Sequence, residues 1–170
     1  MKLAAMFKDL EKQIKKGIQE SIADTLENEV FEVVREIVLN RIQNDVYDVY
    51  KPKVYIRRHT TQGLMDENNI VYDLENNKKT LVVWNIAKYN PHNSPTTAFS
   101  TEKRKHNILQ KLIIDGWRNV KPDDPAYRQP RPFIANANKE LKRGGSHRKS
   151  LEEAFELGLA RHGINKKTTR

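Results

Sequence analysis

The fold is decided by residues 3–49, LAAMFKDLEKQIKKGIQESIADTLENEVFEVVREIVLNRIQNDVYDV, which contain no proline and a single glycine, Gly17. Apolar residues recur in this stretch at steps of three and four, which is the spacing of an amphipathic helix. The pattern predicts one long helix, or two consecutive helices with a break or kink at Gly17. A helix of about 45 residues would be roughly 68 Å long, whereas a globule of this chain length is about 31 Å wide. Part of the helix should therefore protrude or pack on a neighbouring subunit.

Two short stretches beyond this helix, residues 69–74 and 80–87, are predicted to form an antiparallel hairpin. They are rich in β-branched and aromatic residues, which favour strands. Residues 75–78 between them, Glu-Asn-Asn-Lys, favour a turn because asparagine tolerates left-handed backbone angles. Two strands alone are marginally stable, so we expect further strands from residues 53–58, from residues 113–120 or from a neighbouring copy.

Helical spacing returns at residues 102–115 and 133–143, on either side of a proline-containing loop at residues 121–132. A last helix is predicted to begin at a capping box formed by Ser150 and Glu153 and to end at Gly163. The fold class is therefore α+β: a long N-terminal helix packed on a small antiparallel β-sheet, with further helices toward the C-terminus.

We expect a single structural domain over residues 1–164. Its parts are a helical region, a region of loop and hairpin, and a region of helices and proline-rich loop, at residues 1–49, 50–100 and 101–164. Residues 165–170 are predicted to form a flexible tail.

Composition limits the function classes open to this chain of 170 residues, which contains no cysteine. Disulfide scaffolds, cysteine-based zinc sites and thiol catalysis are therefore excluded, and the chain suits a reducing cytoplasm. The longest apolar runs, residues 3–7 and 81–84, are far shorter than the roughly 18–20 residues of a membrane span. Charge returns at Lys8 and Asp9, so we expect neither a signal peptide nor a membrane partner.

Charge is spread unevenly along the chain, whose formal net charge is +9. Residues 1–50 carry a net −3, residues 51–100 a net +3 and residues 101–170 a net +9. The basic end could meet nucleic acid, or it could meet the acidic end of another copy, head to tail in a ring. A basic, solvated surface without a partner is the third explanation, and charge alone does not choose among the three.

Catalytic and cofactor motifs give little support for an enzyme. No two of the five histidines have the i, i+4 spacing of a helical metal pair, and the glycine-rich phosphate loops and the nucleophile elbow do not occur in the sequence. Glu140-Leu141-Lys142 matches the Glu-x-Lys part of a metal-dependent nuclease pattern, but no acidic strand precedes it. We predict no catalytic residue, no metal site and no cofactor, with a nuclease as the less favoured alternative.

Two basic clusters could neutralise the phosphates of DNA. The possible DNA-facing residues are Lys103, Arg104, Lys105, Lys142 and Arg143. Few aromatic residues accompany them, so base stacking is not the expected mode of binding, and no nucleic-acid-binding module is recognisable. A basic nucleic-acid-binding accessory protein is the main alternative function.

Three stretches of the chain, taken in order, resemble a known family. They are YKPKVYIRR at residues 50–58 with Gly63-Leu64-Met65-Asp66, VWNIA at residues 83–87, and IDGW at residues 114–117 with PRPFI at residues 130–134 and a terminal helix. This order is similar to that of small structural proteins of tailed bacteriophages, of the minor tail or tail-completion type found at the head–tail junction. The resemblance covers most of residues 45–160.

The resemblance implies both a fold and a role. In that family a long N-terminal helix packs on an antiparallel sheet, and a C-terminal helix follows a Pro-Phe element. We therefore expect a virion structural protein without enzymatic activity, assembled in the host cytoplasm and located at the head–tail junction as a tail-completion, terminator or neck protein. It would form a homo-oligomeric ring, a hexamer or dodecamer, that joins the portal to the tail tube. The expected partners are other neck and tail proteins, together with DNA held by non-specific contacts.

Named residues follow from the expected ring together with the uneven charge along the chain. The ring contact is predicted to join the acidic helix at residues 20–48 to a basic face within residues 103–149. The predicted interface residues are Glu27, Glu29, Glu32, Glu36, Arg57, Arg58 and Asp66. The predicted loop anchors are Trp117, Arg131 and Phe133; burial of a phenylalanine ring stabilises a fold by about 1.5–3 kcal/mol.

Overall fold

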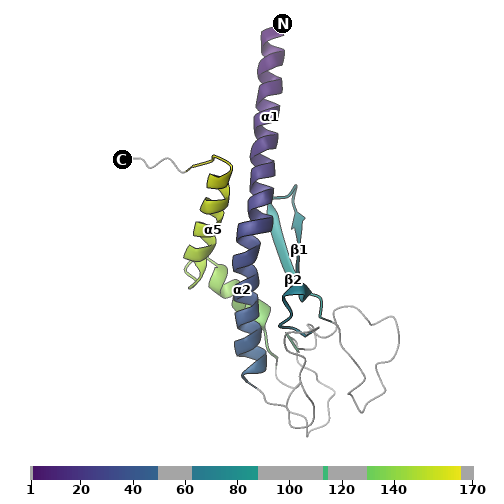
Figure 1. Ribbon diagram of the computed structural model, residues 1–170, viewed down its shortest axis with the longest axis vertical. Coiled ribbons are helices and arrows are strands. Elements are labelled where there is room, and N and C mark those ends of the chain that lie inside the picture. The colour runs from purple at the N-terminus through teal and green to yellow at the C-terminus, as the bar shows by residue number, and fades with distance from the viewer. Residues whose placement is uncertain (1, 50–62, 88–112, 115–129, 166–170) are drawn as a thin grey trace, which may run out of the picture.

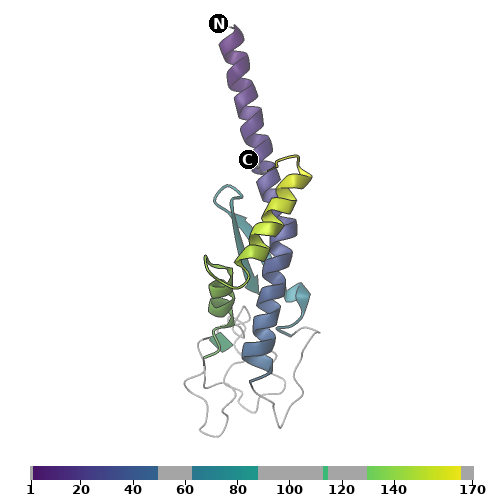
Figure 2. The ribbon, with the colours of Figure 1, turned by 90° about the vertical axis from the view of Figure 1, so that its left-hand side faces the viewer.

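A single rod of helix forms the spine of the molecule (Figures 1 and 2). The structure is a computed structural model that describes residues 2–49, 63–87, 113–114 and 130–165. The rod consists of α1 (Lys2–Thr25), the π turn η1 (Leu26–Val30), α2 (Phe31–Ile42) and the π turn η2 (Gln43–Tyr47). Residues at the junctions keep right-handed helical angles, so the axis continues through the π turns for about 69 Å at 1.5 Å per residue.

One side of the rod carries the hairpin of β1 (Ile70–Glu75) and β2 (Thr80–Asn85). The strands pair antiparallel, with Ile70 opposite Asn85 and Glu75 opposite Thr80. The backbone turns through three consecutive residues at positive φ, between 51° and 63°: Asn76, Asn77 and Lys78. The asparagines thus take the left-handed angles that their sequence predicted.

Contacts at both ends hold the hairpin along the rod. Near its base the ring of Tyr72 lies 4.5 Å from the ring of Phe31 on α2, centroid to centroid and tilted by 50°. At its tip Gln19 Nε2 donates a hydrogen bond of 2.6 Å to the carbonyl oxygen of Asn77. The hairpin therefore reaches back along α1 as far as Gln19 and no further in the described part of the chain.

The side of the rod opposite the hairpin is covered by α5 (Arg148–Arg161), and α4 (Phe133–Leu141) packs on α2 (Figures 1 and 2). The hydrophobic core lies where α2, η2, the hairpin and α4 meet. It contains Phe31, Ile37, Val38, Ile42, Val46, Leu64, Ile70, Ala87, Ile113, Phe133 and Ala137. Because this core surrounds only the α2 half of the rod, the α1 half has little packing of its own.

The N-terminal half of α1 stands clear of the body (Figures 1 and 2). Every side chain from Leu3 to Ile18 is exposed, and Gln19 is the first that is partly buried. These 16 residues extend for about 24 Å at 1.5 Å per residue. The protrusion predicted from helix length alone is therefore present.

The α+β fold class and the antiparallel hairpin are confirmed. Of the two alternatives for residues 3–49, one long helix is confirmed and two consecutive helices are not, and the predicted cap of the last helix is wrong. The helix does not break at Gly17, because α1 continues through it and the irregular turn comes later, at η1. Ser150 does not cap the last helix, because α5 begins at Arg148 after His147, without a side-chain cap.

Other sequence predictions fall partly outside the described residues. Residues 113–114 are helical, which fits the predicted helix at residues 102–115 and contradicts a strand beginning at residue 113. The remainder of that helix, the possible strands at residues 53–58 and 115–120, and the end of the tail are not among the residues described. The organisation of residues 1–164 as one domain stays a prediction.

Candidate assembly interface

The seat of α5 on the rod is built around two small residues. Thr25 on α1 is fully buried, and Gly158 of α5 lies against it. A Cβ atom at Gly158 would lie 2.8 Å from Thr25 Oγ1 and 2.7 Å from Glu29 Oε2, both shorter than van der Waals contact. Only glycine allows α5 to lie this close to α1 and η1.

Charged groups surround this seat. Arg161 at the end of α5 pairs with Asp24, and its Nη1 lies 3.0 Å from Glu29 Oε1. His162 Nε2 donates a hydrogen bond of 2.8 Å to Asp24 Oδ2. This hydrogen bond, together with the positive charge of Arg161, lowers the pKa of Asp24 below its ordinary value of 3.8. The cluster ties the C-terminal end of α5 to the point where the rod leaves the body.

A second charged cluster joins α2 and η2 to α4. Arg41 pairs with Glu140 of α4 and lies 3.6 Å from Asp45. His147 Nδ1 lies 3.4 Å from the other oxygen of Glu140. Because the Glu140 side chain is only 15% exposed and engaged on both sides, it is a structural carboxylate in this fold and not an open metal ligand.

The four predicted acidic interface residues differ in whether they form ion pairs within the described part of the chain. Glu29 pairs with Arg161 and its side chain is 17% exposed, and Glu32 pairs with Arg35. Glu27 and Glu36 form no ion pair with any residue that the structure describes, and Glu36 is exposed. Of the four glutamates, Glu36 is therefore the one that is both exposed and without an ion pair among the described residues, and its contact with another copy stays a prediction.

The other predicted interface residues lie away from this acidic face or outside the described part. Asp66 caps the short helix η3 (Glu67–Asn69) by accepting a hydrogen bond of 3.1 Å from the backbone N–H of Asn68. Arg57 and Arg58 are not among the described residues. A pairing of Asp66 with these arginines therefore stays a prediction.

Two of the three predicted loop anchors are described. Phe133 is fully buried in the core. The backbone N–H of Arg131 donates a hydrogen bond of 2.9 Å to the carbonyl oxygen of Ile113, which joins the segment before α4 to a residue far away in the sequence. Trp117 lies outside the described residues.

The basic cluster between α4 and α5 lies on the surface. Lys142 and Arg143 are exposed in the turn after α4, and Arg148 and Lys149 are exposed at the start of α5. Both α5 residues form i, i+4 ion pairs, Arg148 with Glu152 and Lys149 with Glu153. Lys103, Arg104 and Lys105, the other possible DNA-facing residues, lie outside the described part.

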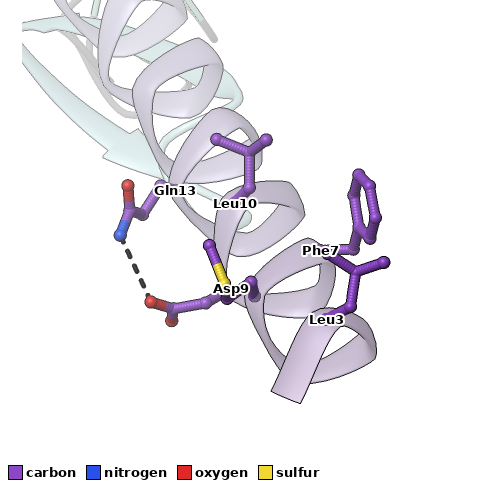
Figure 3. A pocket seen from close by; sticks show the side chains of 6 residues that line it. Leu3, Phe7, Asp9, Leu10 and Gln13 are labelled. Atoms are coloured by element: carbon purple, nitrogen blue, oxygen red, sulfur yellow. Dashed lines mark hydrogen bonds between the residues drawn. The ribbon is translucent and has the colours of Figure 1, made fainter. Parts of the chain in front are cut away.

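The protruding half of α1 carries an apolar face that the sequence contained but that our site prediction missed. Six large apolar side chains on it are 47–68% exposed; we call them the α1 stripe, and they are Leu3, Met6, Phe7, Leu10, Ile14 and Ile18. A shallow groove open to solvent lies at the N-terminal end of this stripe, lined by Leu3, Met6, Phe7 and Leu10 together with Asp9 and Gln13 (Figure 3). The hydrogen-bonded pair Asp9 and Gln13 lies beside the apolar side chains, at the edge of the same groove.

Neither a metal centre nor a membrane span is found among the described residues. No group of three or more histidine, aspartate or glutamate side chains in this part of the chain could hold a metal ion. None of the helices described is both long and apolar enough to cross a membrane.

A comparison with known protein families finds a match to most of the chain. The family model YomN matches residues 6–160, which cover all of the hairpin and α4 and nearly all of the rod and α5. No curated protein and no solved structure matches the chain. Since the family model spans most of the chain, the protein belongs to the YomN family, which carries the name of a Bacillus phage-derived protein, and it is a phage-related protein.

Proposed function

We propose that this phage-related protein is a structural component of the virion at the head–tail junction, as a tail-completion, terminator or neck protein. In this proposal several copies form a ring between the portal and the tail tube. The ring joins the two assemblies and surrounds the passage for DNA. It works through contact surfaces and has no catalytic centre.

The observation that carries the proposal is the rod with its exposed N-terminal half. A chain of this size gains stability by folding its apolar side chains into a core, yet six large apolar residues of α1 lie outside it. Exposed apolar area of this extent is typical of surfaces that bind other proteins. Membership of a phage-related family supports an assembly role within a phage particle.

A deletion in the phage that encodes the protein tests this role. We expect lysates of the deletion mutant to contain filled heads and separate tails, with normal particles restored by the gene supplied in trans. Mass spectrometry of purified wild-type particles should find the protein in fixed proportion to the portal. Joined, infectious particles in the mutant, or absence of the protein from purified particles, would contradict the proposal.

The exposed basic cluster at Lys142, Arg143, Arg148 and Lys149 favours a second candidate, a nucleic-acid-binding accessory protein. Binding to duplex DNA that weakens with salt in the way expected for several phosphate contacts would support it. Under this candidate the protein binds DNA as a monomer or dimer, so light scattering with and without DNA separates it from the ring. A metal-dependent nuclease is tested by incubating plasmid with the protein and Mg²⁺ or Mn²⁺.

A further inference from the structure

We infer that the α1 stripe is the surface by which copies of this chain associate, each packing the protruding half of α1 in parallel against the same face of its neighbours. This inference deepens the proposed function and rests on it for the ring arrangement. It names the contact between copies, which differs from the acidic-to-basic contact predicted from charge.

The width of the stripe indicates a bundle of helices. At 100° per residue, the six side chains span about 120° of the helix circumference. A two-stranded coiled coil uses a narrower seam of two positions in seven. In a bundle each helix contacts a neighbour on both sides, which requires the wider apolar face that α1 has.

The area of the stripe is sufficient for stable association. At 47–68% exposure, and with about 200 Å² for each large side chain, the six residues expose roughly 700 Å². Two such faces together bury up to about 1,400 Å², which lies within the usual range for specific protein interfaces. A stripe this large exceeds the apolar patches found on most monomeric proteins.

The stripe continues a surface that already packs on a helix. At 100° per residue, Thr25 lies on the same face of α1 as Ile14 and Ile18, and Thr25 is covered by Gly158 of α5. The end of α5 meets Asp24 through Arg161 and His162, and the exposed stripe begins two turns further toward the N-terminus. A helix from a second copy can therefore lie on α1 beyond the end of α5.

Symmetry makes the arrangement parallel. Copies related by rotation about one axis point their rods in the same direction along that axis, so their stripes meet at equal heights. A 16-residue helix without tertiary contacts is only marginally stable, and the bundle supplies the packing that the body of the chain does not.

The charges beside the stripe favour protein over a lipid surface. Glu11 and Glu20 lie at its two borders by helical position, and both pair with lysines of α1, Glu11 with Lys15 and Glu20 with Lys16. An interfacial membrane helix has a predominantly basic polar face, whereas the polar side of α1 is mixed, with five lysines and four acidic residues, Asp9, Glu11, Glu20 and Asp24. Binding to anionic vesicles is therefore an outcome that the test includes.

Single cysteines test the parallel register, because the natural chain contains none. We would make Phe7→Cys, Ile14→Cys and, on the opposite face of α1, Lys12→Cys, each in the full-length protein. Under mild oxidation Phe7→Cys and Ile14→Cys should both form disulfide-linked dimers, at least about ten times faster than Lys12→Cys, since bridging requires Cβ atoms within roughly 4.5 Å. Cross-linking at neither position, or at only one of them as in an antiparallel pair, would overturn the inference.

A double substitution tests the apolar contact itself. Light scattering of the wild-type chain should show an oligomer that persists in 1 M NaCl, where charges are screened beyond about 3 Å. Leu10→Asn with Ile14→Asn should weaken association by about a hundredfold or more, while Leu157→Asn, on exposed α5, should not change it. Circular dichroism checks that each variant is folded.

The results separate this inference from the proposed function. A wild-type chain that stays monomeric, or a folded double variant that assembles as wild type does, overturns the bundle even if the protein is found in phage particles. Specific cross-links with no protein in purified particles leave the bundle standing and overturn the virion role. A monomer that binds vesicles of phosphatidylserine and phosphatidylcholine through Leu10 and Ile14 shows that the stripe meets lipid instead.

Discussion

Gly158 on α5 lies directly against Thr25 on α1, where a Cβ atom at Gly158 would come within 2.8 Å of Thr25 Oγ1. Thr25 is itself fully buried and donates its hydroxyl to the carbonyl oxygen of Ser21 at 2.8 Å. Neither partner can move aside without breaking a contact. The distance between α5 and the rod is therefore set by this pair.

Substituting Gly158 should show how closely the two helices are packed. We expect Gly158→Ala to lower the free energy of unfolding by about 1–2 kcal/mol, because the overpacking cost exceeds the gain in helix propensity. Gly17→Ala is the matched control, since Gly17 is also helical but has nothing near its added Cβ. It should raise the free energy of unfolding by roughly 0.5–1 kcal/mol. Urea unfolding measures both, and equal effects of the two alanines would show that α5 is not closely seated.

The ion pair between Arg41 and Glu140 should contribute measurably because both side chains are largely shielded, at 29% and 15% exposed. Among the carboxylates of the described residues, Glu140→Gln leaves Arg41 with the more distant Asp45, and we expect a loss of about 1–2 kcal/mol in the free energy of unfolding. Glu153→Gln breaks the exposed pair with Lys149 and should cost less than about 0.5 kcal/mol. Thermal unfolding of both variants is the measurement, and a larger effect at Glu153 would contradict this ranking.

Removal of the Phe133 ring should be more damaging than loss of either ion pair. Phe133 is fully buried where α4 meets α2, so Phe133→Ala should cost about 3–5 kcal/mol, a large share of the stability of an ordinary domain. If that variant does not fold, Phe133→Leu gives a smaller measurable loss. Urea unfolding is the measurement. Leu157→Ala, at an exposed position on α5, should have almost no effect on the free energy of unfolding measured in this way.

Acid should weaken the contact between α5 and the rod through Asp24. Because the pKa of Asp24 is lowered in the folded protein, chiefly by the hydrogen bond from His162, the carboxylate stabilises the fold above its ordinary pKa of 3.8. That contribution disappears as the pH falls through the lowered pKa. The difference in unfolding free energy between wild type and Asp24→Asn should therefore shrink below about pH 4.

Urea unfolding at several pH values between 3 and 6 tests this sign. Glu153→Gln serves as the control for loss of one exposed carboxylate. A difference between wild type and Asp24→Asn that stays constant, or grows, as the pH falls would show that Asp24 gains nothing from Arg161 and His162 in the folded state.

The sequence predicted the large elements because their signals are local. Apolar residues recur every three or four positions from Leu3 to Val46, which predicts the rod. The length of the rod alone required a protrusion. The turn at Asn76 and Asn77 set the hairpin. The π turns were missed because one extra residue hardly changes the spacing of apolar residues. At η1, for example, the extra residue leaves two adjacent apolar residues, Val30 and Phe31, both buried.

The details that depend on tertiary contact were not available from local patterns. Ser150 with Glu153 has the form of a capping box, yet α5 begins earlier, at Arg148, directly after the turn that follows α4. From the sequence alone, Gly158 predicts only a loss of helix stability. In the structure its missing side chain leaves room for Thr25, so that α5 can pack closely on α1. The roles of Asp24 and Arg161 were missed for the same reason, since 137 residues separate them.

The π turn η1 also determines which way the protruding half of α1 faces. A π turn contains one residue more than an α-helical turn, and each helical residue advances by about 100° around the axis. The π turn therefore takes up this extra residue with little change of direction around the axis, and winding the same residues, Leu26 to Val30, as α-helix without a deletion would rotate the upstream helix by about 100° relative to the body. The apolar residues near the N-terminus would then face a different direction relative to the body, and the helices of neighbouring copies could no longer pack through them. Orientation of the whole projecting arm thus depends on a single inserted residue.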